Sequence, residues 1–293
     1  MTIEHIESRV ADAKQQGIIY ESLHELLLDE EMEERGMPHA EREIRRKNRL
    51  AVIGAQEEVG SQVVSDLAEK DFDIIAFVEK VDEALEVLKK VNEALRHYKG
   101  TGLKIVADKL DDEDRATALF SRVSQVISIW EARKAYFEVR SAQDYYETAL
   151  RPSLVIANAC KRSGVDRIIF ASHGSTLKEE KMSKNALAVL SRPGGTSLSE
   201  EAIRQSGIPY VVARFPNLKK KTDATELDAA VGTISHIVMK KDVLKKDLEF
   251  SSDRIETAML KKIGTSKSPA ANALSRKFLL CAVARATGTK GKK

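Results

Sequence analysis

The sequence predicts an α/β fold whose core is a doubly wound parallel sheet of the Rossmann-like kind. Between Leu50 and Phe215, short apolar segments typical of buried strands alternate with longer segments of helical periodicity. Connections of this length join parallel strands. The chain has 293 residues, of which 42% are hydrophobic, enough for a sizeable core. We therefore expect a Rossmann-like domain over 49–218, preceded by a helical acidic extension over 1–48 and followed by a short helical basic region over 219–293.

The expected elements follow one another in the order that such a sheet requires. Helices come first, within residues 3–47, where Ile6, Val10 and Ala13 recur at helical spacing before Gly17 interrupts the pattern. Six buried strands are expected at 49–55, 73–79, 102–108, 124–130, 165–173 and 208–215. The helices between them are expected at 60–70, 81–98, 111–123, 149–164 and 197–207.

The periodic pattern weakens after Pro216. Residues 218–228 begin with a run of lysines and predict a loop. A short helix is expected at 251–264, because this segment starts with a serine that suits an N-cap and ends with a glycine. A second helix is expected at 269–286, which is typical of a helix that closes a domain.

Composition excludes several classes of protein. The net charge is only +3, so the whole chain gives no argument for nucleic acid. Cys160 and Cys281 form no CxxC motif, which favours a reducing compartment, either the cytoplasm or an organelle stroma or matrix. No apolar run approaches the roughly 18 residues of a membrane span, so no transmembrane segment is expected. The acidic first ten residues lack the apolar stretch of a secretory signal.

The charge is unevenly distributed between the two ends of the chain. Residues 1–48 contain twelve Asp and Glu against seven Lys and Arg, whereas 257–293 contain nine Lys and Arg and no carboxylate. These extensions suggest contacts with protein partners, and residues 261–293 suit nucleic acid or an anionic membrane surface. Two other interpretations stand beside these: the ends are simply solvated, or they bind each other.

Four segments in series resemble the NmrA-like group of atypical short-chain dehydrogenases/reductases. They are AVIGAQEEVGSQVVSDLAEKDFDIIAFVEK, IVADKLDD, LVIANACKRSGVDRIIFASH and SEEAIRQSGIPYVVARFPNL. The first resembles the βαβ unit of that family, which normally carries G-A-T-G-x-x-G, and the second its third strand, which ends in an aspartate that contacts adenine. The resemblance covers roughly residues 49–218 and implies a dinucleotide-binding type of fold.

The loop after the first strand departs from the family pattern at its centre. Gly54 and Gly60 match the first and last glycines, which allow a tight turn and close helix packing. Ala55, Gln56 and Glu57 lie between them, with Glu57 in place of the middle glycine that lets the backbone approach a pyrophosphate. One interpretation is a loop kept for packing, with NAD(P) bound weakly or not at all. The other is a remodelled cofactor loop.

Other candidate cofactor contacts lie at the ends of later strands. Glu79 would favour the ribose of NAD, although Lys80 follows it and both residues also suit a solvated loop. Asp108 either faces adenine or caps the following turn. Ser128, in the fourth strand, completes the set together with Ser172, at the end of the fifth strand. The alternative for Ser172 is an ordinary hydrogen bond at a strand end.

No catalytic or metal-binding residue is expected. Classical members of the superfamily use a Tyr-x-x-x-Lys pair, in which the lysine lowers the pKa of the phenol. None of the six tyrosines has a lysine four residues later. The histidines show no metal-binding spacing, and neither a GxSxG motif nor a P-loop is present.

The resemblance and these departures together favour a non-catalytic protein. Members of the superfamily include nucleotide-sensing regulators and accessory or assembly proteins of organellar energy-converting complexes. The expected function is that of a scaffold, assembly factor or accessory subunit of a larger complex. The alternatives are an NAD(P)(H)-dependent oxidoreductase or redox sensor with a remodelled loop, and a protein that binds RNA or a membrane surface through its basic C-terminus.

Overall fold

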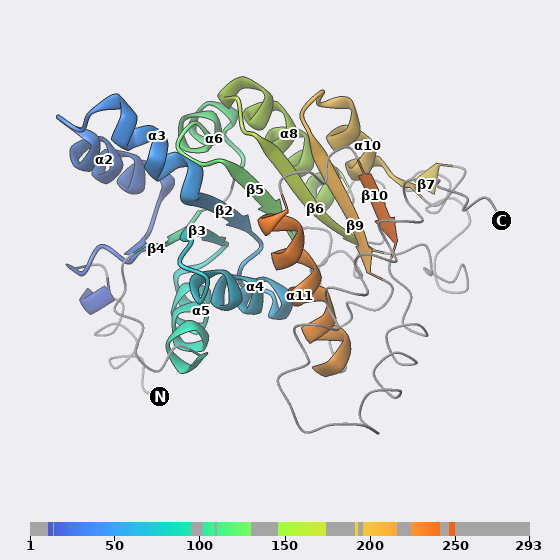
Figure 1. Ribbon diagram of the computed structural model, residues 1–293, viewed down its shortest axis with the longest axis horizontal. Helices are drawn as coiled ribbons and strands as arrows, with labels where there is room; N and C mark the ends of the chain where they lie inside the picture. The colour runs from blue at the N-terminus through green and yellow to red at the C-terminus, as the bar shows by residue number, and fades with distance from the viewer. Residues whose placement is uncertain are drawn as a thin grey trace.

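The computed structural model confirms an α/β fold with a doubly wound sheet (Figure 1). The helices expected at 251–264 and 269–286, and the basic segment 261–293, lie outside the described residues. The structure describes residues 11–13, 15–94, 102–108, 110–129, 146–173, 191–192, 196–215, 224–240 and 246–249.

The main sheet has eight strands, all parallel, in the order β1-β4-β3-β2-β5-β6-β9-β10. The strands are β1 (Ile19–Tyr20), β2 (Arg49–Ile53), β3 (Asp73–Val78), β4 (Leu103–Ala107), β5 (Gln125–Ser128), β6 (Arg167–His173), β9 (Tyr210–Phe215) and β10 (Lys246–Glu249). The order reverses between β2 and β5, which makes this position the topological switch point of the sheet. Strands β7 (Ser191–Arg192) and β8 (Thr196–Ser197) form a separate antiparallel pair.

Helices cover both faces of the sheet (Figure 1). One face packs against α4 (Glu58–Ala68), α5 (Val81–Ala94) and α11 (Ala224–Met239). The other packs against α2 (Leu23–Glu34), α6 (Glu113–Phe120), α8 (Arg151–Ser163) and α10 (Leu198–Gln205). A π-helical turn, η3 (Tyr146–Leu150), precedes α8, and α3 (His39–Asn48) leads into β2.

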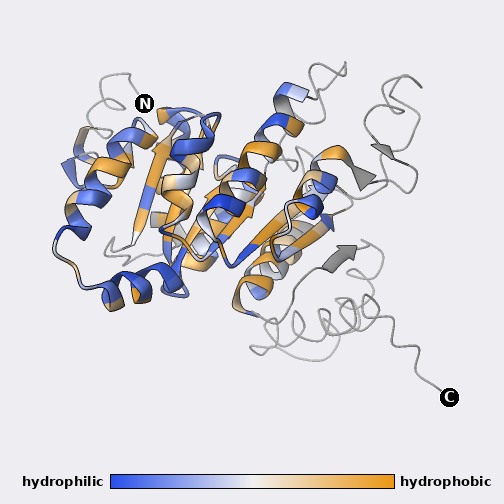
Figure 2. Cartoon of the chain, turned by 90° about the horizontal axis from the view of Figure 1, so that it is seen from above, coloured by the Kyte–Doolittle hydropathy of each residue, from blue (hydrophilic) through white to orange (hydrophobic). Residues whose placement is uncertain are grey.

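Alternating side chains of each central strand enter two separate cores. In β2, Leu50 and Val52 belong to the core beneath α4, whereas Ala51 and Ile53 belong to the core beneath α6 and α8. Parallel strands are buried on both faces in this way, which explains their continuously apolar sequence. Figure 2 shows hydrophobic residues concentrated on the strands and on the helix faces turned toward them.

The loop expected at 218–228 is wrong from Ala224 onward, because α11 begins there. The buried residues of α11 recur at helical spacing, so the sequence carried a signal that the preceding charged run obscured. The hydrophobic ones are Leu227, Ala230, Val231, Ile234, Ile237 and Val238, and Ser235 is buried as well. Strands β1 and β10 were also not expected, because segments of two and four residues give little periodic pattern.

A buried arginine binds the C-terminal end of α11 to the sheet. Arg167, at the start of β6, donates hydrogen bonds to the carbonyl oxygens of Ile237 at 2.8 Å, Val238 at 3.0 Å and Lys240 at 2.6 Å. It also donates to the side chain of Gln125 in β5. Carbonyl groups at a helix C-terminus have no partners within the helix, and a guanidinium group complements both their hydrogen bonds and their partial negative charge.

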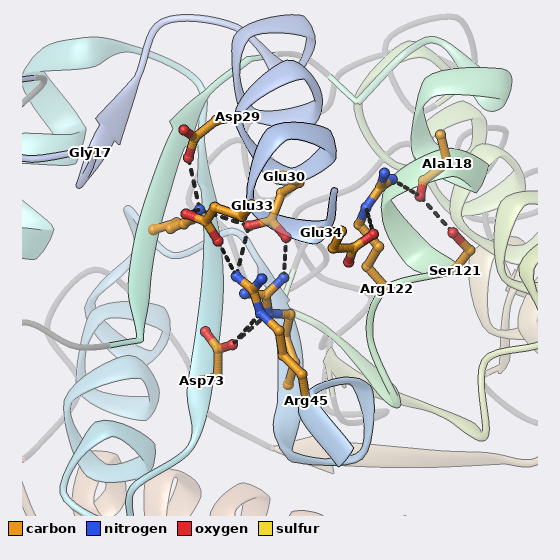
Figure 3. Close-up of polar contacts among 12 residues, drawn as sticks. Gly17, Asp29, Glu30, Glu33, Glu34, Arg45, Asp73, Ala118, Ser121 and Arg122 are labelled. Atoms are coloured by element: carbon orange, nitrogen blue, oxygen red, sulfur yellow. Dashed lines mark hydrogen bonds and ion pairs between the residues drawn. The ribbon is translucent and has the colours of Figure 1, made fainter. Parts of the chain in front are cut away.

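An ionic cluster joins α2 and α3 to the amino edge of the sheet (Figure 3). Arg49 and Glu30 are both buried and form an ion pair, and Arg49 also binds Asp73 at 2.6 Å. Lys104 in β4 contacts Glu30 at 2.8 Å, and Arg45 pairs with Glu33. Burial opposes the charge on Glu30, but Arg49 and Lys104 outweigh it and lower the pKa of this carboxyl group. The N-terminal helices are therefore held to the sheet by charge as well as by apolar contact.

Candidate functional site

The residues expected to contact a cofactor all lie at the carboxyl edge of the sheet. Gly54 follows β2, Glu79 follows β3 and Asp108 follows β4, while Ser128 ends β5 and Ser172 lies near the end of β6. The strands are parallel, so these five positions share one edge. In open α/β sheets, ligands bind beyond this edge at the switch point, which here lies between Gly54 and Ser128.

Two glycines set the shape of the loop between β2 and α4. Gly54 has a φ of +85°, a conformation that side chains rarely allow. A Cβ atom at Gly60 would lie 2.1 Å from the carbonyl oxygen of Gly54, so only glycine allows α4 to start this close to the loop. The backbone N–H of Ala55 donates to Phe77 of β3 at 2.9 Å and holds the turn against the sheet.

Glu57 occupies the N-cap position of α4. Its backbone is extended, its carbonyl oxygen accepts from Ser61 at 2.8 Å, and its side chain makes no capping hydrogen bond to the helix. Glu58 follows as the first residue of the helix and is exposed. A helix N-terminus favours negative charge, and here two carboxylate residues, Glu57 and Glu58, stand at the start of α4.

The end of β3 is organised around the start of α5. The carboxylate of Glu83 accepts hydrogen bonds from the backbone N–H groups of Glu79 at 3.0 Å and Lys80 at 3.1 Å. This arrangement caps α5, because it satisfies N–H groups that have no partner within the helix. The backbone donors at this strand end are therefore already used within the protein.

Asp108 binds the N-terminal segment of the chain. Its Oδ2 atom accepts a hydrogen bond of 2.7 Å from the backbone N–H of Leu23, the first residue of α2. Its own backbone N–H donates to Val78 of β3 at 3.1 Å. This contact with α2 comes in addition to the two expected roles, an adenine contact and a cap on the following turn, and it leaves both open. This hydrogen bond could not be predicted from a sequence pattern, because 85 residues separate the two partners.

Two polar side-chain atoms near the switch point are buried without a hydrogen-bond partner. They are Oγ of Ser128 and Oε1 of Gln56, and Ser128 is fully buried. Buried polar atoms usually have partners, and leaving one without a partner costs about 1–3 kcal/mol. These atoms are the features of this edge that most favour a bound ligand.

Ser172 belongs to a buried polar network at the end of β6. Its hydroxyl donates to Oε1 of Glu200 at 2.6 Å, and Glu200 is itself fully buried. Arg214 of β9 and Arg204 of α10 both bind Glu200, at 2.6 and 2.8 Å. Sequence reasoning missed this network, because Glu200 and Arg204 have the i, i+4 spacing of an ordinary surface pair.

Tyr20 and Lys104 lie close together on the neighbouring strands β1 and β4. The ammonium group of Lys104 is 5.7 Å from the centre of the Tyr20 ring. Burial, together with a 2.6 Å hydrogen bond to Asp29, raises the pKa of Tyr20. The raised pKa is the opposite of the lowered pKa that favours proton transfer by a catalytic tyrosine.

Three further observations concern small-molecule, metal and membrane binding. A cleft of about 290 Å³ lies at the amino edge and is lined largely by members of the ionic cluster. Within the described ranges, no group of three or more His, Cys, Asp and Glu residues is arranged to hold a metal ion. The same part of the chain contains no helix that is both long and apolar enough to span a membrane.

Comparison with known proteins extends these observations. Residues 46–217 match the model of the NmrA-like family. No curated protein matches the chain.

Three solved structures share the fold at low sequence identity. A putative NAD-dependent epimerase/dehydratase from Bacillus halodurans is 16% identical, with a TM-score of 0.52 over 69% of this chain and 92% of that one. UDP-glucuronic acid 4-epimerase from Bacillus cereus, in complex with NAD, is 13% identical, with a TM-score of 0.51 over 75% and 85%. The Bordetella bronchiseptica enzyme WbmH, in complex with NAD+, is 14% identical, with a TM-score of 0.50 over 75% and 83%.

Proposed function

Since the chain belongs to the NmrA-like family, we propose that it is a non-catalytic member that binds NAD(P) weakly or not at all. It would serve as a scaffold, assembly factor or accessory subunit of a larger complex. The observation that carries the proposal is Glu57, a carboxylate at the N-cap of α4, where the family loop has its middle glycine.

The cost of this carboxylate to a bound dinucleotide is large. Two unit charges of the same sign about 4 Å apart repel by roughly 4 kcal/mol at an effective dielectric constant of 20. That energy corresponds to about three orders of magnitude in affinity, at about 1.4 kcal/mol per factor of ten. The Glu57 side chain would also occupy space that the pyrophosphate needs.

Contacts elsewhere at this edge support the same proposal. The Asp108 carboxylate is bound by Leu23, and the Ser172 hydroxyl is bound by Glu200. At the ends of β4 and β6, polar groups that a cofactor would use therefore already have partners within the chain, whereas Oγ of Ser128 at the end of β5 has no hydrogen-bond partner. A ligand would have to replace such contacts, and this replacement lowers its net binding energy.

The proposed partner is another protein, bound through the charged extensions. Helix α3 buries no residue, and Ile44 on it is 70% exposed. Met32 on the neighbouring α2 is also 70% exposed. Exposed apolar side chains among charged ones are typical of surfaces that bind proteins. Isolation of the protein from its own cells under mild conditions, with identification of what copurifies, tests this part of the proposal.

Calorimetric titration with NADH and NADPH tests the cofactor part. We expect the native chain to show no binding at micromolar concentrations. Glu57→Gly removes both the charge and the side chain, so it is expected to create measurable dinucleotide binding. Glu58→Gly is the matched control, because it removes the same charge one residue later at an exposed position. Micromolar binding by the native chain contradicts the proposal, and equal gains in the two variants contradict the role of Glu57.

A second candidate function is an NAD(P)(H)-dependent oxidoreductase or redox sensor with a remodelled loop. The specific observation in its favour is the pair of buried, unpartnered atoms, Oγ of Ser128 and Oε1 of Gln56, beside the switch point. In this case Glu79 would favour NADH over NADPH. Micromolar binding of NADH by the native chain, weakened by Ser128→Ala, would favour this function over the first.

A further inference from the structure

The N-terminal strap, defined as residues 19–26, lies beside the nucleotide half of the carboxyl edge. Strand β1 pairs in parallel with β4, so that Tyr20 lies opposite Val106 and the chain leaves β1 at the carboxyl edge. Helix α2 begins at Leu23, immediately beyond this edge. The strap thus brings a helix N-terminus to the ends of β3 and β4.

The strap is anchored through Asp108. Leu23 donates its backbone N–H to Asp108 at 2.7 Å, and its side chain is buried with that of Leu26 in the core. Ser22 caps the same helix, because its hydroxyl accepts from the N–H of Glu25 at 3.2 Å. Leu23 and Glu25 in the first turn of α2 thus already have acceptors for their N–H groups, and at these two positions the helix end needs no ligand.

We propose that the strap is an autoinhibitory contact that competes with a nucleotide base for Asp108. In a doubly wound sheet, one nucleotide lies across the carboxyl ends of one βαβαβ half, which here comprises β2, β3 and β4. Asp108 follows β4 and hydrogen-bonds back to β3, so it lies where the base end of that nucleotide would reach. The strap orients its carboxylate and occupies the space next to Oδ2. This inference rests on the proposed function. It adds a second barrier to dinucleotide binding, beside the carboxylate of Glu57.

The position of Leu23 allows a substitution that removes the N–H donor, and a second substitution controls for the loss of the buried leucine side chain. Leu23 is the first residue of α2, where proline is well tolerated because its missing N–H is not used within the helix. The preceding residue, Ser22, has a φ of −148° and a ψ of 155°, which is the extended conformation that suits a residue before proline. Leu23→Pro therefore removes the hydrogen bond to Asp108. Leu23→Ala, the matched control, removes much of the side chain but retains the N–H.

Titration with NADH compares the two variants in a Glu57→Gly background, after circular dichroism has verified that both are folded. A hydrogen bond to a charged group is worth about 1.5–3 kcal/mol, so we expect Leu23→Pro to bind NADH at least about tenfold more tightly than Leu23→Ala. Equal affinities, or no binding by either variant, overturn the proposal. If the native chain itself binds NADH, the proposed function fails, and the same comparison of Leu23 variants is then made without Glu57→Gly.

Hydrogen exchange gives a second measurement that needs no change in the strap. In the Glu57→Gly chain, saturating NADH is expected to speed amide exchange at Leu23, because the base displaces this N–H from Asp108. Amides in β6 serve as the internal reference. Unchanged or slower exchange at Leu23 would show that strap and nucleotide do not compete.

Discussion

At the scale of single residues, Gly60 is the most constrained position of the loop between β2 and α4. Its role is steric, because the carbonyl oxygen of Gly54 occupies the space that any Cβ atom would need. The same loop carries Glu57 at the N-cap of α4, where its backbone is extended. A single loop can therefore keep the glycine that packing requires and lose the glycine that a pyrophosphate requires.

Gly60→Ala is expected to lower the free energy of unfolding by about 3 kcal/mol, the upper part of the range for inserting atoms into a packed core. Gly164→Ala is the control. Gly164 has a φ of +70° but no atom within 4 Å of its would-be Cβ, so only backbone strain of about 1 kcal/mol is expected. Denaturation in urea measures both. If the two substitutions lower the free energy of unfolding equally, the close contact at Gly60 does not determine the cost of a side chain there.

Glu200 provides a second prediction at this scale. Glu200→Ala removes the buried carboxylate that Arg204 and Arg214 share, while the 3.6 Å contact between Arg204 and Glu201 remains. We expect a loss of about 3 kcal/mol, as when one partner of a buried ion pair is removed. Ser172→Ala removes one hydroxyl donor and is expected to cost about 1 kcal/mol. Urea denaturation of both variants distinguishes them, and a larger effect for Ser172→Ala would contradict the network described above.

At the scale of elements, the amino edge of the sheet holds the helices, whereas the carboxyl edge carries the loops of the candidate site. The amino edge joins α2 and α3 to β2, β3 and β4 through buried and half-buried ion pairs. The same edge receives the C-terminal end of α11 through Arg167. The carboxyl edge carries the loops that a ligand would meet, and there the strap adds one more contact. The contacts at the amino edge thus hold in place the strands whose other ends carry these loops.

The ionic cluster makes the docking of α2 sensitive to acid. The pKa of Glu30 is lowered from its ordinary value of 4.5, so its contribution to stability is complete above that value. The contribution is lost as the pH falls through the lowered pKa of the folded protein. Glu30→Gln is expected to reduce stability at pH 7 and to flatten the decline in acid. The exposed Glu31→Gln serves as control, and urea denaturation from pH 7 to pH 3 measures all three proteins.

At the scale of the whole molecule, most of the sheet could be predicted from the sequence. Buried parallel strands are apolar throughout and the helices between them have one apolar face, so β2 to β6 and β9 carry strong local patterns. Strands β1 and β10 depend on pairing with β4 and β9, which are distant in the sequence. Helix α11 had a readable pattern, but the charged residues before it suggested a loop.

The candidate site, like the sheet, could be predicted from the sequence only in part. The sequence by itself determined the fold class, the positions of Gly54 and Gly60, and the presence of carboxylates at a helix N-terminus, because all of these depend on local periodicity and on residue type. Only the tertiary structure decided the partners of Asp108, Ser172 and Arg49. A hydrogen bond or ion pair between residues far apart in the chain leaves no periodic pattern, since it forms only when the sheet brings the two strand ends and the N-terminal helices together.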